Sequence, residues 1–246
     1  MNKPTLLASI LLATSSICFG QQITVTGRIE LSRSPAKQSP DLSGAVVWLN
    51  PTGVSVNVPA QSRAAEPVQP AQPRAQLLQK KKSFSPHMVV VQVGSPVEFP
   101  NQDPFFHNVF SLFEGRRFDV GLYEAGTSRS VVFNRPGVSY IFCNIHPEMS
   151  AVVVTLKTQY YAISDQEGLI TIRKVPAGMY DMEIWQERAL PESLNTLKRR
   201  VVVSATSNSL GILHLTEQRN FSQLHKNKYG QDYESPVPNA PVYTRP

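Results

Sequence analysis

The sequence predicts an all-β protein, and three observations carry that prediction. Short segments rich in Val, Ile, Phe and Tyr recur along the chain. Gly, Pro, Asn and Asp separate these segments, as turn residues do between strands. No segment has the convincing periodicity of an amphipathic helix, and only residues 188–196 would tolerate one. Short strands separated in this way are typical of a β-sandwich.

The first 20 residues differ from the rest of the chain. A basic start at Lys3 precedes a mostly apolar run from Leu6 to Cys18, and small residues follow near Gly20. This pattern is typical of a secretory signal peptide with cleavage near Gly20. The run is shorter than a membrane span requires, and no second long apolar run occurs. We therefore expect a periplasmic or secreted mature chain without a transmembrane segment.

The next part of the chain predicts two strands and then a disordered insertion. Residues 23–30 alternate in polarity and residues 45–49 form a short apolar run, and both lie in an N-terminal region, 21–58, whose sandwich membership stays open. Residues 59–82 are rich in Pro, Gln and Ala and end in three Lys. Such a composition cannot bury enough apolar surface to order itself.

Two folded units and a tail are expected after the insertion. The first unit spans residues 83–156, with strands at 88–93, 97–99, 107–113, 129–133, 139–143 and 151–156. The second spans residues 157–216, where a turn at 165–168 and a turn at 176–178 separate further strands. Residues 217–246 are polar and Pro-rich, which predicts a disordered tail.

The strongest chemical signal lies directly after the expected strand 139–143. Cys143, His146 and Met149 follow one another at three-residue intervals, and His107 lies in an earlier strand. A thiolate, two imidazoles and a weak thioether are the ligand set of a type 1, or blue, copper site. Cys18 would leave with the signal peptide, so Cys143 would be a lone thiol that copper ligation could occupy. A buried and inert Cys143 is the alternative.

Residues 84–156 resemble a cupredoxin. The spacing of Cys143, His146 and Met149, with Pro147 after the second His, is similar to that of amicyanins. The run from Gly94 to Val109 resembles the strand and N-x-D turn that lead to the first ligand His of the family. The residues between the ligands at 144, 145 and 148 depart from the pattern.

The cupredoxin resemblance implies a Greek-key β-sandwich with one type 1 copper ion. It implies that His107, Cys143 and His146 form a trigonal set and that Met149 is a long axial ligand. It also implies that the backbone N–H of Asn108 points at the cysteine sulfur and tunes its electron density.

Residues 162–185 resemble a carboxypeptidase regulatory-like, or prealbumin-like, β-sandwich, and residues 25–29 and 45–49 resemble the start of that module. The resemblance implies ancestry of fold and no peptidase activity. The expected order is therefore a cupredoxin-like sandwich followed by a small second sandwich. The same order is found in bacterial secreted proteins labelled plastocyanin-like or methylamine utilization proteins.

These patterns favour a secreted protein that carries single electrons between redox partner proteins and is not an enzyme. Copper storage, delivery or sensing is the alternative, because the ligands alone do not separate the two. A cysteine hydrolase would leave Met149 unexplained. The net charge is +6, with basic clusters at 80–82, 116–117 and 198–200. Secretion argues against nucleic acid, so these clusters are either solvated surface or attract an acidic redox partner.

Overall fold

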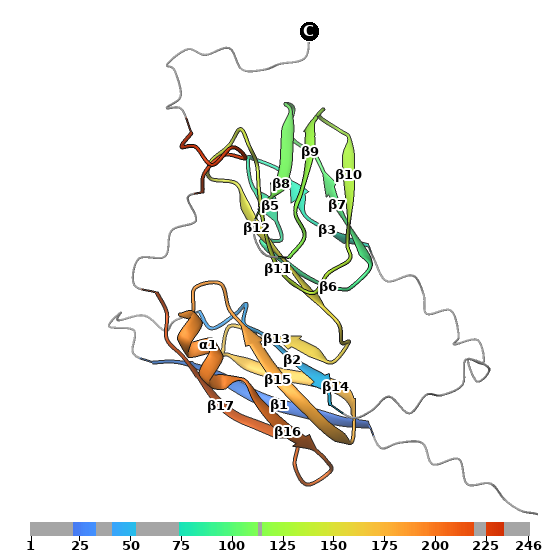
Figure 1. Ribbon diagram of the computed structural model, residues 1–246, viewed down its shortest axis with the longest axis vertical. Coiled ribbons are helices and arrows are strands. Elements are labelled where there is room, and N and C mark those ends of the chain that lie inside the picture. The colour runs from blue at the N-terminus through green and yellow to red at the C-terminus, as the bar shows by residue number, and fades with distance from the viewer. Residues whose placement is uncertain (1–21, 33–40, 53–73, 113–114, 219–224, 234–246) are drawn as a thin grey trace, which may run out of the picture.

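The computed structural model describes residues 22–32, 41–52, 74–112, 115–218 and 225–233. The predicted signal peptide lies outside these residues, as do residues 53–73 and most of the predicted tail. The described chain consists of strands with one short helix, and its strands form two β-sandwiches (Figure 1). The all-β prediction is therefore confirmed. Within the described ranges, no helix has the length and apolar character that crossing a membrane requires.

The first sandwich, residues 74–156, is built from a five-stranded and a three-stranded sheet. The five-stranded sheet has the order β6 (Met88–Gln92), β12 (Ser150–Leu156), β11 (Gly137–Phe142), β8 (His107–Ser111) and β9 (Phe118–Tyr123). The facing sheet has the order β10 (Ser128–Phe133), β7 (Ser95–Pro100) and β3 (Ala75–Gln76). A small hairpin of β4 (Leu78–Gln79) and β5 (Phe84–Ser85) lies beside them.

Alternation along the strands places the core of the first sandwich. Val97 and Phe99 of β7 are fully buried, whereas the residues between and beside them are less so. They share one apolar cluster with Phe133 of β10 and Ile141 of β11. Because neighbouring side chains of a strand point to opposite faces, this spacing gives the sheet one inner face.

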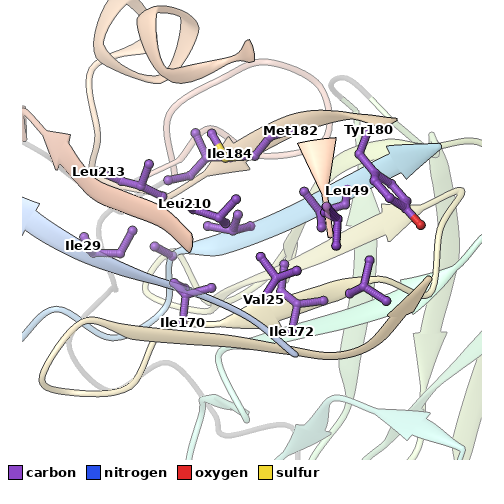
Figure 2. Close-up of a cluster of buried hydrophobic side chains, with 14 of the residues drawn as sticks. Val25, Ile29, Leu49, Ile170, Ile172, Tyr180, Met182, Ile184, Leu210 and Leu213 are labelled. Atoms are coloured by element: carbon purple, nitrogen blue, oxygen red, sulfur yellow. The ribbon is translucent and has the colours of Figure 1, made fainter. Parts of the chain in front are cut away.

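The second sandwich contains strands from both ends of the described chain. One sheet has the order β14 (Leu169–Pro176), β1 (Gln22–Leu31) and β17 (Ser209–Leu215). The other has the order β13 (Tyr161–Ile163), β2 (Val46–Pro51), β15 (Gly178–Trp185) and β16 (Arg199–Val203). Aliphatic side chains of both sheets meet between them (Figure 2). The helix α1 (Pro191–Leu197) buries none of its residues.

The N-terminal strands settle the question that the sequence left open. β1 pairs with β14 and β17, and β2 pairs with β13 and β15. Both strands therefore belong to the second sandwich. We expected the first sandwich to precede the second in the chain. Instead, the first sandwich is inserted into the second between β2 and β13. We call residues 74–156 the inserted sandwich and the other described strands the host sandwich.

The predicted disordered insertion, 59–82, is wrong at its C-terminal end. Residues 74–82 include β3, which pairs with β7, and β4, which pairs with β5. Leu77 between them is fully buried in the core of the inserted sandwich. The physical reason is that a single buried Leu and strand pairing order this stretch despite its Gln and Lys content.

The two sandwiches pack against each other through an apolar face. Val152 and Val154 of β12 are buried with Val46 of β2, and Trp48 and Trp185 pack against them. β12 is buried over most of its length because its other face carries Ala151 and Val153 into the core of the inserted sandwich. This matches the uninterrupted apolar run in the sequence, which is typical of a strand covered on both faces.

Candidate metal centre

The predicted donors meet at one end of the inserted sandwich. His107 is the first residue of β8, and Cys143 follows directly after the end of β11. These two strands are antiparallel neighbours, with Phe142 opposite Phe110. Strand pairing therefore brings together two donors that lie far apart in the sequence, and the turn after Cys143 adds His146.

The donor atoms are already close enough to share a metal ion. The Cys143 Sγ atom lies 3.7 Å from His107 Nδ1 and 3.6 Å from His146 Nδ1. One ligand atom from each of the three residues lies within 4.8 Å of the others. Cys143 and His107 are fully buried, and His146 is partly exposed.

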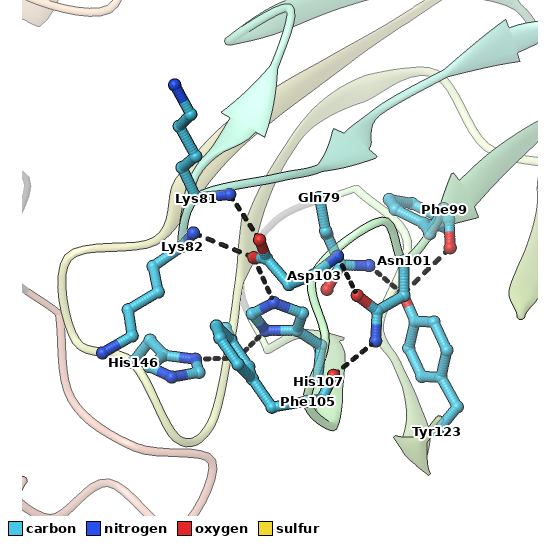
Figure 3. Close-up of polar contacts among 11 residues, drawn as sticks. Gln79, Lys81, Lys82, Phe99, Asn101, Asp103, Phe105, His107, Tyr123 and His146 are labelled. Carbon is cyan, nitrogen blue, oxygen red and sulfur yellow. Dashed lines mark hydrogen bonds and ion pairs between the residues drawn. The ribbon is translucent and has the colours of Figure 1, made fainter. Parts of the chain in front are cut away.

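Asp103 fixes the orientation of the His107 ring (Figure 3). The Nε2–H group of His107 donates to Asp103 Oδ2 at 2.8 Å. In a neutral ring the other nitrogen, Nδ1, is then left with a free lone pair, and it faces Cys143. A carboxylate that binds the remote nitrogen of a metal-ligating His is a common device for orienting the ring.

Asp103 is in turn held by the hairpin of β4 and β5. The backbone N–H groups of Lys81 and Lys82 donate to its two oxygens at 2.6 and 2.9 Å. Both lysines have φ of 55°, the left-handed conformation that turns their N–H groups to the carboxylate. Burial raises the pKa of Asp103, but these bonds and the one from His107 outweigh it, so the pKa is lowered.

The sequence did not single out this role of Asp103. It identified Asp103 only as part of the N-x-D turn, in which Asn101 Oδ1 accepts from the Asp103 backbone N–H at 3.0 Å. The four-residue spacing from Asp103 to His107 was the available signal. The partner lysines lie in the stretch that was expected to be disordered, so the network could not be anticipated.

His146 lies at the exposed side of the site. Its ring is 4.9 Å from that of His107 and 5.6 Å from that of Phe105, measured between centroids. Burial, together with the nearby His107 and Lys82 charges, lowers the pKa of His146 to about 4. The ring is therefore neutral at neutral pH, as a metal ligand must be.

Pro104, Phe105 and Phe106 directly precede His107 in the chain. Phe105 and Phe106 are half-buried and Pro104 is exposed. Phe105 contacts both histidine rings, at 5.2 Å from His107 and 5.6 Å from His146. The segment is therefore a rim at the exposed side of the site.

Cys143 lies in surroundings that favour a metal-bound thiolate over a free one. Burial raises the pKa of its thiol. Backbone N–H groups of Asn108, Ile145 and His146 bond to the sulfur and act in the opposite direction. These donors would stabilise a thiolate once a metal ion replaces the proton. The arrangement at Asn108 is the one that the family resemblance implied, and its tuning effect stays a prediction.

Met149 closes the loop that begins at Cys143. The backbone N–H of Met149 donates to His146 O at 3.1 Å, and the Cys143 N–H donates to Met149 O at 3.3 Å. The Met149 side chain is fully buried in the same apolar cluster as Cys143. Its place in this cluster is compatible with an axial ligand, and that role stays a prediction.

The predicted disordered tail, 217–246, is wrong for residues 225–233. These residues pack against the loop that carries Cys143, with Tyr233 and Lys228 bonded to it. The His225 ring stacks on Phe142 with 4.0 Å between the centroids. Apolar stacking and hydrogen bonds order a stretch whose polar composition suggested otherwise.

The donor set fits a copper ion. One thiolate and two imidazoles converge in a buried site, and soft sulfur with imidazole is the combination that suits both oxidation states of copper. The rings of both histidines have lowered pKa values because of burial, so no proton has to be expelled from them at neutral pH. His107, Cys143 and His146 would hold the ion, with Met149 as the fourth candidate.

No family model matches the chain, and no curated protein matches it. Among solved structures, a purple cupredoxin from Nitrosopumilus maritimus is 24% identical over 33% of this chain and 99% of its own, with a TM-score of 0.31. A reduced amicyanin mutant is 22% identical over 34% of this chain and 83% of its own, with a TM-score of 0.32. A copper-containing nitrite reductase from Thermus scotoductus is 22% identical over 44% of this chain and 26% of its own, with a TM-score of 0.34. Each of these likenesses covers less than half of this chain.

Proposed function

We propose that this chain is a secreted type 1 copper protein that carries single electrons between redox partners and is not an enzyme. The observation that carries the proposal is the convergence of ligand atoms from His107, Cys143 and His146 within 4.8 Å of one another at one end of the inserted sandwich. Bound copper would supply a one-electron couple. The chain's own contribution is to hold the donors.

Several contacts support a site that hardly changes between oxidation states. His107 is fixed by Asp103, and the backbone of Cys143 is fixed by Met149. Both donors come from neighbouring strands of one sheet, so neither has to move to reach the metal. Small movement means a small barrier to electron transfer, because pre-organised groups need no reorganisation at the moment of reaction.

The surface around His146 supports a route for electrons to and from a partner. His146 is the partly exposed donor, and it lies beside the half-buried Phe105 and the exposed Ile145. The Lys82 ammonium is 5.8 Å from the centre of the Phe105 ring. An apolar rim with Lys80, Lys81 and Lys82 beside it suits an acidic redox protein, whose approach the lysines would accelerate.

Two observations weigh against a cysteine hydrolase. Cys143 is fully buried, and burial raises the pKa of its thiol. A catalytic thiol needs the reverse, because the exposed thiolate is the nucleophile.

The visible spectrum after addition of Cu(II) tests the proposal. We expect an intense blue or purple thiolate-to-copper charge-transfer band and a reversible Cu(II)/Cu(I) couple. Cys143→Ser removes the thiolate and should abolish the band completely, even where some copper still binds. Cu(I) binding without any coloured Cu(II) form would instead indicate copper storage, delivery or sensing.

The axial role of Met149 has its own test. Met149→Leu should retain copper and colour but raise the reduction potential, because loss of an electron donor disfavours Cu(II). Cyclic voltammetry of the two proteins measures this shift. A variant that loses copper affinity at an unchanged potential would contradict the axial assignment and indicate a generic chelating loop.

A further inference from the structure

Residues 225–233, which we call the C-terminal strap, lie against the metal-binding end of the inserted sandwich. The strap is the red segment in Figure 1, beside the sandwich that contains β8 and β12, although the preceding described residues belong to the host sandwich. Its bonds reach residues that lie 84 to 109 positions earlier in the chain. The proposed function does not by itself account for this packing.

Two hydrogen bonds join the strap to the residues where the metal loop begins. The Tyr233 hydroxyl donates to the Cys143 carbonyl oxygen at 2.8 Å. The Lys228 backbone N–H donates to Asn144 Oδ1 at 2.8 Å. Cys143 follows the last residue of β11, so its carbonyl lies beyond that strand, and Tyr233 supplies a donor for it.

Other contacts tie the strap to the strands on both sides of the loop. The His225 ring stacks on Phe142 with 4.0 Å between centroids. The Lys228 ammonium pairs with Asp119 Oδ2 at 2.7 Å, and Asp119 Oδ1 accepts from Asn108 Nδ2 at 2.7 Å. The strap therefore connects the residue beside His107 with the loop that starts at Cys143.

We propose that the C-terminal strap is a positioning element of the metal centre, in which Tyr233 and Lys228 keep Cys143 and Asn144 in the metal-ready arrangement before any metal binds. The inference extends the proposed function and rests on it for the identity of the metal. The holding of the loop, however, is a property of the metal-free protein and can be measured there.

Labelling of the Cys143 thiol in the metal-free full chain tests the proposal. Cys143 is fully buried, so a maleimide reagent reaches it only when the loop opens. Tyr233→Phe removes one hydroxyl and keeps the ring. We expect labelling of the peptide that contains Cys143, followed by mass spectrometry, to become about threefold to tenfold faster, as for loss of one hydrogen bond.

Tyr160→Phe is the matched control. It makes the same chemical change on a half-buried side chain that packs against the host core beside Tyr180. It should label at the wild-type rate. Deletion of residues 225–246 should accelerate labelling more than Tyr233→Phe does, because it removes every strap contact together.

Hydrogen exchange separates positioning from a general loss of stability. In Tyr233→Phe, amides of residues 143–149 should exchange faster, while those of β1 and β17 keep their wild-type rates. Equal labelling of Tyr233→Phe and wild type would overturn the proposal, as would faster exchange spread evenly over both sandwiches. A wild-type protein without a blue copper form would refute the proposed function. The labelling and exchange results on the metal-free protein would still test the role of the strap independently.

Discussion

The core of the host sandwich and the metal-binding end of the inserted sandwich are both buried, but they are stabilised in opposite ways. The host core contains aliphatic side chains with Tyr180 and Met182 and no buried charge (Figure 2). The metal end buries Gln79, Asn101, Asp103 and His107, each with a hydrogen-bond partner (Figure 3). Burial of apolar surface stabilises the first region, whereas hydrogen bonds among buried polar groups such as Asp103 and His107 position the second.

The comparison separates two tasks. Aliphatic packing tolerates exchanges between apolar side chains of similar volume, and it provides most of the stability. A buried polar network fixes the direction of each of its groups through hydrogen bonds. The host core can therefore be altered without changing the site, whereas a change within the network alters the site directly.

A cavity in the host core should give the largest change in stability. Leu49→Ala removes a fully buried side chain of β2 and should lower the free energy of unfolding by about 2–5 kcal/mol. The copper spectrum should stay unchanged, because Leu49 belongs to the host cluster and not to the cluster of Cys143. Chemical denaturation and the visible spectrum measure the two effects.

Val202→Ala is the control for Leu49→Ala. Val202 lies on β16 of the same sandwich and is 56% exposed, so its loss should change the stability by less than about 0.5 kcal/mol. A shifted copper band in Leu49→Ala would show that the two regions are not separable.

Unlike Leu49→Ala, a substitution of Asp103 is expected to change copper binding. Asp103→Asn replaces one acceptor oxygen by a donor group, which opposes the N–H groups of Lys81, Lys82 or His107. The copper affinity should fall by about 10–100-fold, as for the loss of other groups that orient a ligating His. Competition with a chelator measures it.

Asp181→Asn serves as the control for Asp103→Asn. Asp181 pairs with Arg200 on the surface of the host sandwich and is half exposed, so copper affinity should not change. Equal affinities of Asp103→Asn and wild type would mean that His107 is oriented without the carboxylate.

The contact between the two sandwiches should give the smallest effect, and it depends on pH. His87 Nε2 lies 2.7 Å from Glu187 Oε2 of the host sandwich. The hydrogen bond that the His87 ring donates to Glu187 raises the pKa of His87 and outweighs the opposite effect of burial. A raised pKa in the folded protein means that the stabilisation is complete below about pH 6.5, the usual value. It is lost as the pH rises through the raised pKa.

The expected size is under about 1 kcal/mol, because the His87 side chain is 40% exposed and the pair is screened by solvent. Melting temperatures of the metal-free protein across this range measure it. Glu187→Gln should remove the part of the pH dependence that belongs to His87. The same slope in both proteins would exclude the ion pair as a source of stability.

The strands and the metal-binding turn after Cys143 could be predicted from the sequence because their signals are local. Alternation marks β7, and the regular spacing of Cys143, His146 and Met149 indicates a chelating turn. The role of Asp103 could not be predicted, because its other partners lie in a Lys-rich stretch without strand periodicity.

The other features of the fold and of the site could not be predicted, because they depend on contacts between residues that lie far apart in the sequence. β1 pairs with β17 across almost the whole chain, and nothing in either strand specifies the other. Tyr233 and Lys228 lie in a polar, Pro-rich stretch, and contacts with the inserted sandwich, among them those with Cys143 and Asn144, order residues 225–233. The composition of a segment indicates how much apolar surface the segment can bury by itself. It does not indicate whether another part of the folded protein offers a surface on which the segment can pack.

The insertion of one sandwich into the other has a consequence for the order of events at the ribosome. β1 is made first, yet its neighbours β14 and β17 emerge only after the whole inserted sandwich. Domains fold as units when their residues are available, so the inserted sandwich can complete its strand pairing while the host is still unfinished. The earliest described strand, β1, must therefore remain without a sheet partner until β14 emerges, and its second edge stays unpaired until β17 follows.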